Sequence, residues 1–369
     1  MRTYFFAGLA ILVLLACETP PDPADGSLPD GGAALDAGPI DPPQCEGLPT
    51  LPSPTCAPLD TDYAPGADDM WEACISDNGA YNRVLDDIST VARVAAYEEL
   101  RGALFDPTRD PSSEEFLAGR LIYQREQGLD SRVVRRFDPW FEVPDGTDCT
   151  AEGVPALFPD HCVGPALLQP VILDAFEQGI RGAPRSRVQA ARIEASLLWF
   201  FYASTAKEAF TCTRTAKDCD SAYAYYTGGE PARGGIGLAA DVARTAPEAH
   251  DRAWDGILAL RCWRDLDDAE VATDTVLRDR ARAQLDRAVT QGVAMLVRAR
   301  LVQACETEGE TLLYHWTFAR TLAPALQRAA LERDPAQAGA LTDALLPERP
   351  GAGDATRAIE ALDALFDCP

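Results

Sequence analysis

The apolar residues recur at helical spacing beyond about residue 67, and this pattern constrains the fold more than any other feature of the chain. Alternation of apolar and polar residues, which is typical of half-buried strands, is almost absent, and runs of β-branched residues are few. The pattern predicts helices over residues 68–76, 79–105, 113–127, 165–182, 187–211, 220–226, 236–244, 247–262, 272–305, 310–332, 334–345 and 353–366.

These segments predict an all-α fold: a disulfide-stapled helical bundle, or two fused bundles, spanning residues 67–369. Pro184, Pro231 and Pro247 fall at or near the expected breaks, where proline stops a helix. The intervening stretch 128–164 is irregular, and we expect a disulfide between Cys149 and Cys162 to hold it.

The chain opens with MRTYFFAGLAILVLLAC, in which an apolar run from Tyr4 to Ala16 follows Arg2. The run is too short to span a bilayer, and it ends in Leu-Leu-Ala-Cys17, which resembles the bacterial lipobox. That resemblance implies a signal peptide over residues 1–16 and a lipidated Cys17 at the start of the mature protein. An uncleaved signal anchor is the less favoured alternative.

Lipidation at Cys17 would place the protein in the bacterial cell envelope, attached to the membrane by its acyl chains. Glu18 stands where an aspartate would signal inner-membrane retention, so we expect the outer membrane, facing the periplasm or the exterior. Residues 17–66 hold twelve of the 28 prolines, with many Gly and Asp residues. This composition predicts a disordered linker between the anchor and the helical domain.

Without Cys17, ten cysteines remain, an even number that predicts a disulfide framework in an exported chain. No C-x-x-C pair occurs, which argues against zinc knuckles and thioredoxin-type chemistry. Proximity in sequence favours three local bridges, with two long-range bridges among the remaining cysteines. The local pairs are Cys45–Cys56, Cys149–Cys162 and Cys212–Cys219, and the others are Cys74, Cys262, Cys305 and Cys368.

The formal charge of −25 argues against nucleic acid as a partner and against electrostatic binding to anionic lipid. The sequence names no protein partner. It also lacks the G-x-S-x-G, Walker A and H-E-x-x-H motifs, and its three histidines, His161, His250 and His315, match no catalytic pattern. We therefore expect a protein that is not an enzyme.

Two acidic residues lie in the most apolar segment, RIEASLLWFFYASTAKEAF. Glu194 and Glu208 share one helical face, but fourteen residues separate them by about 21 Å along the axis, so one ion cannot bind both. A buried carboxylate needs a partner. For Glu194 we favour an arginine over a metal ion; the candidates are Arg181, Arg187, Arg298, Arg300 and Arg320.

Glu208 lies close in sequence to Cys212, Cys219 and Asp220. A Cys212–Cys219 bridge would concentrate acidic groups there, which allows a divalent or ferric ion site. The favoured alternative is that Asp220 caps the next short helix. We expect the aromatic residues Trp199, Phe200, Phe201 and Tyr202 to belong to the core rather than to a ligand pocket.

Two segments resemble a known family. Asp220-Ser-Ala-Tyr-Ala-Tyr-Tyr-Thr-Gly228 resembles a D-x-A-[WY]-A-x-Y-x-G signature of the algal low-iron-inducible periplasmic proteins, an iron-assimilation family. Glu308-Gly-Glu-Thr-Leu-Leu-Tyr314, followed by Ala323-Pro324, is similar to a later E-G-x-x-[FY] helix of that family. The resemblance implies a helical, secreted, metal-associated protein, with Glu194, Glu208, Asp220 and Glu310 as the candidate ligands.

These observations predict an anchored lipoprotein with a non-enzymatic binding domain, which binds iron or another divalent or trivalent cation through carboxylates. The alternative is a structural or protein-interaction lipoprotein without a metal site, in which the interior acids pair with arginines.

Overall fold

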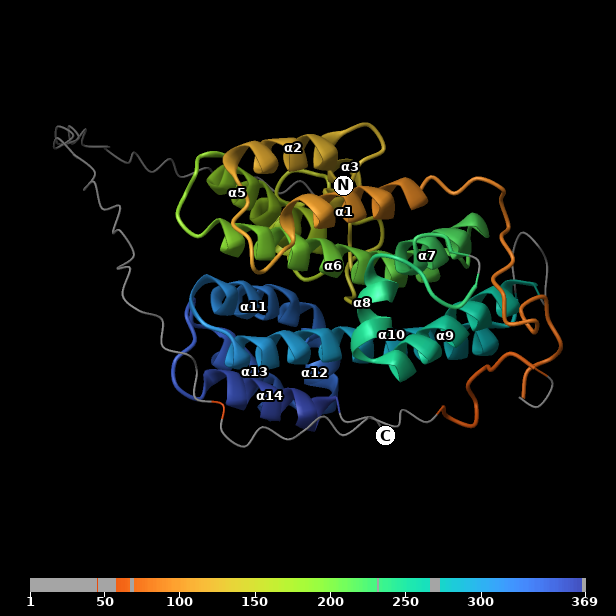
Figure 1. The fold of residues 1–369 in the computed structure, drawn as a ribbon. Helices are drawn as coiled ribbons and strands as arrows, with labels where there is room; N and C mark the ends of the chain where they lie inside the picture. Colours follow the sequence, from red (N-terminus) through yellow and green to blue (C-terminus); the bar gives the residue numbers. More distant parts are fainter. Residues whose placement is uncertain (1–44, 46–57, 67–69, 231, 266–272, 367–369) are drawn as a thin grey trace, which may run out of the picture. The chain divides into compact units, whose positions relative to one another are not determined.

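The computed structural model describes residue 45 and residues 58–66, 70–230, 232–265 and 273–366. The described chain is built from helices and contains no strand, which confirms the all-α prediction (Figure 1). The elements are α1 (Val91–Leu104), α2 (Ser113–Gln124), α3 (Asp130–Val133), α4 (Val154–Leu157), η1 (Gly164–Leu168), α5 (Gln169–Ile180), α6 (Ser186–Thr211), α7 (Lys217–Thr227), α8 (Leu238–Thr245), α9 (Pro247–Asp265), α10 (Thr275–Glu306), α11 (Gly309–Leu322), η2 (Ala323–Leu326), α12 (Gln327–Arg333), α13 (Pro335–Leu345) and α14 (Asp354–Leu365).

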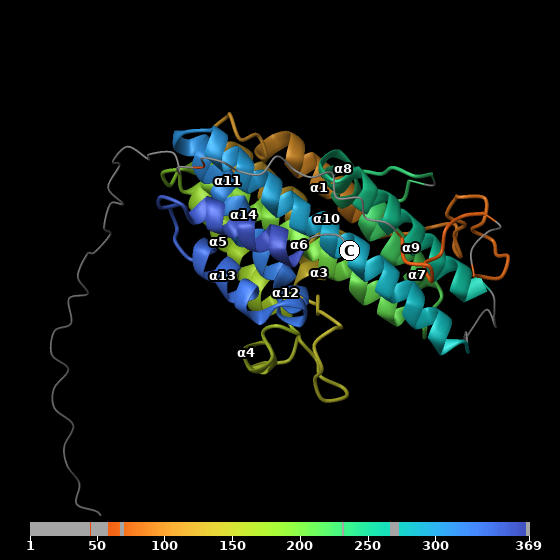
Figure 2. The same cartoon turned by 90° about the horizontal axis from the view of Figure 1, so that it is seen from below.

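Helix α6 lies at the centre of the core and packs against α1, α5, α7, α10 and α11. Its apolar residues surround the helix, and Ala190 to Ala209 are buried at most positions, as expected for a helix enclosed by neighbours. Helix α10 packs against α9 on one side and against α11 and α14 on others (Figures 1 and 2). All described helices belong to one unit, rather than to two separate bundles.

Local sequence accounts for several helix ends. Ser112 and Glu115 form a reciprocal capping box at the start of α2, as the Asp-Pro-Ser-Ser-Glu-Glu segment indicates. The Asp274 side chain accepts a hydrogen bond from Leu277 N–H at the start of α10. Gly228 ends α7 in the left-handed region, with φ at 74°.

Two predictions near the start of the domain were wrong. Residues 70–76 form turns rather than a helix, and the helix expected from residue 79 begins only at Val91. Asp77 accepts a hydrogen bond from Cys74 N–H at 2.8 Å, and Asn78 accepts one from Ala80 N–H at 3.0 Å. Such short polar side chains bind nearby backbone groups and so favour turns over helix.

The ordered domain also begins before residue 67. Tyr63, which we placed in the linker, is 1% exposed. Its backbone N–H donates to Gln284 Oε1 at 2.9 Å, and its carbonyl accepts from Gln284 Nε2 at 2.8 Å. These two hydrogen bonds, from the backbone of Tyr63 to the side-chain amide of Gln284, hold the segment 58–66 against α10.

Four disulfides join described cysteines, and the pairs Cys149–Cys162 and Cys212–Cys219 are confirmed. Cys74 bonds to Cys262, one of the expected long-range connections. The predicted Cys45–Cys56 bridge was wrong, because Cys45 bonds to Cys305 near the end of α10. The entropy lost on closing a loop increases only slowly with the length of the loop. Proximity in sequence is therefore a weak guide, and the folded geometry determines which cysteine bonds to Cys45. Cys56 and Cys368 lie outside the described residues.

Among the described helices, none combines the length and the apolar character that a membrane span requires. The predicted signal peptide, Cys17 and most of the linker lie outside the described residues.

Candidate functional site

Glu194 is buried, at 3% exposure. Arg300 Nη2 of α10 lies 3.1 Å from its Oε1, and the Tyr314 hydroxyl donates to Oε2. Burial raises the pKa of the Glu194 carboxyl, and the charge of Arg300 opposes that rise. The favoured interpretation, an arginine partner for Glu194, is therefore confirmed, and Arg300 was one of the expected candidates.

Glu208 is also buried and paired with cations. Arg136 Nη1 lies 3.2 Å from its Oε1, and Lys207 Nζ lies 3.0 Å from its Oε2. Arg136 comes from the irregular segment after α3 and also donates to the Tyr225 hydroxyl at 3.2 Å. Both carboxylate oxygens thus already accept charge-assisted hydrogen bonds.

Asp220 lies inside the first turns of α7 and does not cap this helix, so the favoured alternative for it was wrong. Its carboxylate instead accepts hydrogen bonds from the backbone N–H groups of Val84 and Leu85, at 2.8–3.0 Å, and from the Tyr81 hydroxyl at 3.0 Å. The ring of Tyr81 stacks on Tyr223 with centroids 4.0 Å apart. Asp220 therefore fixes the segment before α1 against α7.

Glu310 lies in the first turn of α11, where its charge complements the helix dipole. Arg185 Nε is 3.6 Å from its Oε1, and burial raises the pKa of its carboxyl. None of the other three candidates contacts it.

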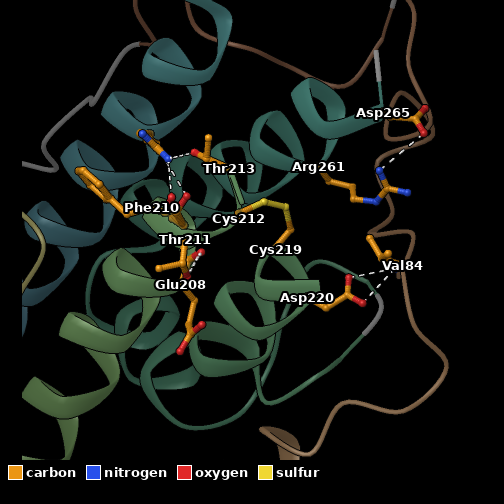
Figure 3. Close-up of a disulfide and its surroundings, with 12 residues drawn as sticks. Val84, Glu208, Phe210, Thr211, Cys212, Thr213, Cys219, Asp220, Arg261 and Asp265 are labelled. Carbon is orange, nitrogen blue, oxygen red and sulfur yellow. Dashed lines mark hydrogen bonds and ion pairs between the residues drawn. A yellow bond between two sulfur atoms is a disulfide. The ribbon is translucent and has the colours of Figure 1, made fainter. Parts of the chain in front are cut away.

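The four predicted ligands do not converge. Figure 3 shows the carboxylates of Glu208 and Asp220 well apart from each other, with Asp220 directed towards Val84. Within the ranges that the structure describes, no group of three or more His, Cys, Asp or Glu residues is placed to hold a metal ion. The bridge does bring α6 and α7 together, but it does not turn their acids towards a common point.

A pocket of about 400 Å³ lies elsewhere, where α6 and η1 face the α11–α13 segment. Its walls are mainly apolar, and they include side chains from six helical elements and the loop that Cys149 and Cys162 close. The lining residues are Asp138, Phe141, Asp160, Val163, Leu167, Trp199, Arg320, Ala323, Pro324, Ala325, Gln327, Arg328, Leu331, Leu341, Thr342, Leu345 and Leu346. We call it the apolar pocket. Its size is within the range of small-molecule sites.

Asp138 supplies a buried carboxyl group to this pocket, with 8% of the residue exposed. Its backbone N–H donates to His161 O at 2.7 Å, and its Oδ1 accepts from Trp140 N–H at 2.9 Å. Its Oδ2 accepts no hydrogen bond from the described residues. Burial raises the pKa of the Asp138 carboxyl to about 6, which leaves one ionised oxygen available to a ligand near neutral pH.

Two arginines line the same pocket with different roles. Arg328 Nη2 donates to both carboxylate oxygens of Asp286, at 2.8 and 2.9 Å, and the guanidinium group lies over the Trp140 ring. Arg320 has no ion pair or side-chain hydrogen bond with the described residues, although it is half-buried at the pocket wall. Arg328 is therefore a structural cation, whereas Arg320 remains free to meet a ligand.

Two backbone segments approach each other closely beside Asp138, and this contact positions the Asp138 side of the apolar pocket. Gly164 N–H donates to Arg136 O at 2.9 Å, and a Cβ atom added at Gly164 would lie 2.0 Å from Val133 O. Only glycine fits here. The segment that carries Asp138 is thereby held directly against η1.

No protein-family model, curated protein or solved structure matches this chain significantly. The resemblance to the algal iron-assimilation family therefore stays a prediction that rests on the quoted motifs.

Sequence reasoning missed the apolar pocket. Phe200, Phe201 and Tyr202 belong to the core as expected, but the adjacent Trp199 lines the pocket. The signal that could have identified Asp138 is its place between Phe137 and Trp140 in the stapled segment, where an acid is surrounded by large apolar side chains. Arg320 was considered only as a partner for Glu194.

Asp138→Asn is expected to stabilise the protein at pH 8 by about 3 kcal/mol, and the gain should vanish below about pH 4. The native carboxyl has a raised pKa of about 6, so the folded state holds its proton while the unfolded state has released it. Stability therefore falls as pH rises between about 4 and 6, at about 1.4 kcal/mol per unit of pKa difference. Denaturant unfolding across pH 4–8 measures this. Asp160→Asn, at an exposed pocket residue, is the control, and a gain for Asp138→Asn that is independent of pH contradicts the assignment.

Proposed function

We propose that the protein is a lipid-anchored lipoprotein of the bacterial envelope whose helical domain is a non-enzymatic binding module, with the apolar pocket as its binding site. The observation that supports this most directly is the combination of a mainly apolar cavity of about 400 Å³ with a buried carboxylate that has one unused oxygen. Anchoring at Cys17 remains part of the proposal, and lipid labelling that persists in a Cys17→Ser variant would refute it.

The pocket chemistry favours an apolar ligand that carries a hydrogen-bond donor. Trp199, Leu341 and Leu345 supply apolar surface, and Asp138 Oδ2 offers an acceptor at the wall. Burial of such a ligand would contribute roughly 25 cal/mol of favourable binding free energy for each Å² of apolar surface removed from water. An amine or amide N–H would restore the hydrogen bond that Asp138 otherwise makes to solvent.

Thr342→Trp is expected to weaken binding of the dye N-phenyl-1-naphthylamine at least tenfold. This probe is apolar and carries one N–H donor, and a tryptophan at the exposed, pocket-lining residue 342 would fill the cavity. Dye fluorescence titrated with the full chain measures the affinity.

The matched control is Asp343→Trp, which places the same bulk on the neighbouring exposed residue outside the pocket. It should bind the dye like the parent chain. Equal affinity in all three chains would reject the pocket as the binding site, and it would leave the structural alternative as the better description.

Metal binding through Glu194, Glu208, Asp220 and Glu310 remains a prediction, but the geometry supports the alternative better, because each carboxylate already has a cationic or N–H partner. Elemental analysis of the purified chain, with unfolding temperatures measured in Fe, Mn, Ca and chelator, checks it. Stoichiometric metal together with a stabilising shift would restore the metal hypothesis.

A further inference from the structure

A second pocket, of about 580 Å³, lies where the start of α1 meets the end of α6 and the start of α7. We call it the basic pocket, because both lysines of the whole chain, Lys207 and Lys217, line it together with Arg132. Its other lining residues are Leu85, Asp87, Ile88, Ser89, Thr90, Gln127, Glu208, Asp218, Asp220, Ser221 and Tyr225. Such a gathering of cations is unexpected in a chain of charge −25.

Two buried arginines lie against this pocket. Arg93 is 3% exposed, and its Nη1 donates to the carbonyl of Ser89 at 2.8 Å. Arg136 is 4% exposed and reaches Glu208 and Tyr225, which both line the pocket. Burying a guanidinium group is unfavourable unless an anion compensates it.

That compensation is incomplete among the described residues. Glu208 is the one carboxylate that pairs with any of these five cations, and it contacts only Arg136 and Lys207. Arg93, Arg132 and Lys217 form no ion pair with described residues. The buried Nε atoms of Arg93, Arg132 and Arg136 also lack hydrogen-bond partners. Buried donors without an acceptor are rare in folded proteins, and here three of them lie on neighbouring arginines.

The electrostatic environment agrees with this geometry. Burial lowers the pKa of the Arg93 guanidinium, and the nearby charges of Arg132, Arg136 and Arg135 lower it further, although Tyr225 opposes them. The first turn of α1 contains no acidic residue, so no carboxylate within that turn offsets the positive end of its dipole.

The remaining acids at the pocket form no ion pair with these cations among the described residues, and they either accept backbone hydrogen bonds or lie closer to solvent. Asp220 Oδ1 accepts a hydrogen bond from Val84 N–H, and its Oδ2 accepts from Leu85 N–H. Asp87 is exposed and Asp218 is half-exposed, so solvent screens both more strongly than it screens the buried arginines.

We propose that the basic pocket binds an oxyanion with phosphate chemistry, held by Arg132, Lys207 and Lys217 in front of the buried Arg93 and Arg136. Planar guanidinium groups and ammonium groups are the usual partners of phosphate oxygens. The source is either free phosphate or the phosphodiester of a lipid headgroup. This site is independent of the apolar pocket and of the proposed function.

Calorimetric titration of the full chain, purified in detergent, with inorganic phosphate tests the proposal. Arg132→Gln is expected to weaken binding at least tenfold, and Lys217→Gln, at an exposed residue with no packing role, about threefold. Asp218→Asn should strengthen binding about twofold, because it removes a nearby negative charge. Arg214→Gln removes an exposed cation close in sequence to Lys217 but outside the pocket, and it should bind phosphate like the parent chain.

Glycerophosphoglycerol, a water-soluble phosphodiester headgroup, is titrated in parallel with inorganic phosphate. Tighter binding of the diester assigns the site to a lipid headgroup, and tighter binding of inorganic phosphate assigns it to the free ion; both support the shared chemistry. Absence of saturable binding for both probes overturns the proposal. Equal losses in Lys217→Gln and Arg214→Gln overturn it as well, because the effect would then be one of net charge alone.

Discussion

Arg300→Met is expected to lower the free energy of unfolding by about 3–5 kcal/mol at pH 8. Arg300 is the cation that faces the buried Glu194 carboxylate at 3.1 Å. Its removal leaves a carboxylate in the core with the Tyr314 hydroxyl as its one remaining side-chain donor among the described residues. Removing one partner of a buried pair has an effect of this size, because the other charge stays uncompensated. Denaturant unfolding measures the loss.

The loss should decrease as the pH is lowered. Burial already raises the pKa of the Glu194 carboxyl, and the loss of Arg300 raises it further. The folded variant therefore binds a proton that the unfolded chain has released, so its stability increases as pH falls through that raised pKa.

The double variant Glu194→Gln, Arg300→Met is the matched control, and it should lie within about 1 kcal/mol of the parent chain at pH 8. A double variant as unstable as Arg300→Met alone would show that Arg300 acts through packing on Phe318, whose ring centroid lies 4.3 Å from its guanidinium carbon. In that case the loss would also be independent of pH.

Replacing both Cys74 and Cys262 by serine should destabilise the oxidised chain by about 5 kcal/mol. The bridge spans a sequence separation of 188 residues, and chain-entropy arguments assign the largest stabilisation to the longest closed loops. It also fixes the segment before α1, where Tyr81 stacks on Tyr223. Guanidinium unfolding of the oxidised chain gives the difference.

The Cys149–Cys162 bridge supplies the comparison, since its sequence separation is 13. Replacing both Cys149 and Cys162 by serine is expected to lower the free energy of unfolding by about 3 kcal/mol, by the same relation. If the Cys149–Cys162 bridge proves more stabilising than Cys74–Cys262, loop entropy is not the main source of the stabilisation. Packing around the segment that Cys149 and Cys162 close would then be the main source.

Helical periodicity was sufficient to locate most of the fold. The segment 187–211 coincides with α6 within one residue, because an apolar run without proline or glycine has no competing local structure. The same reasoning was wrong for residues 79–90. There the backbone N–H groups of Val84 and Leu85 bind Asp220, 135 residues or more away in the sequence, and this contact replaces helical bonds. Periodicity contains no information about such a partner.

The candidate sites show the same limit. The pairing of Glu194 with an arginine follows from the free energy of burying a charge, which is a property of the residue itself. The choice of Arg300 depends on how α6 packs against α10 and α11, and the apolar pocket depends on how η1 faces α13. Asp138 and Arg320 are 182 residues apart, so nothing in their local sequence connects them.

The bond between Cys45 and Cys305 determines where a pulling force would enter the domain. With the proposed anchor at Cys17, tension from the membrane would reach the fold at the end of α10, a 32-residue helix that packs against α9, α11 and α14. Cys45 is only 28 positions after Cys17, so the fully stretched connection is at most ~100 Å long. The load would bypass Tyr63 and the start of α1, and it would act on the longest described helix while the disulfide is intact.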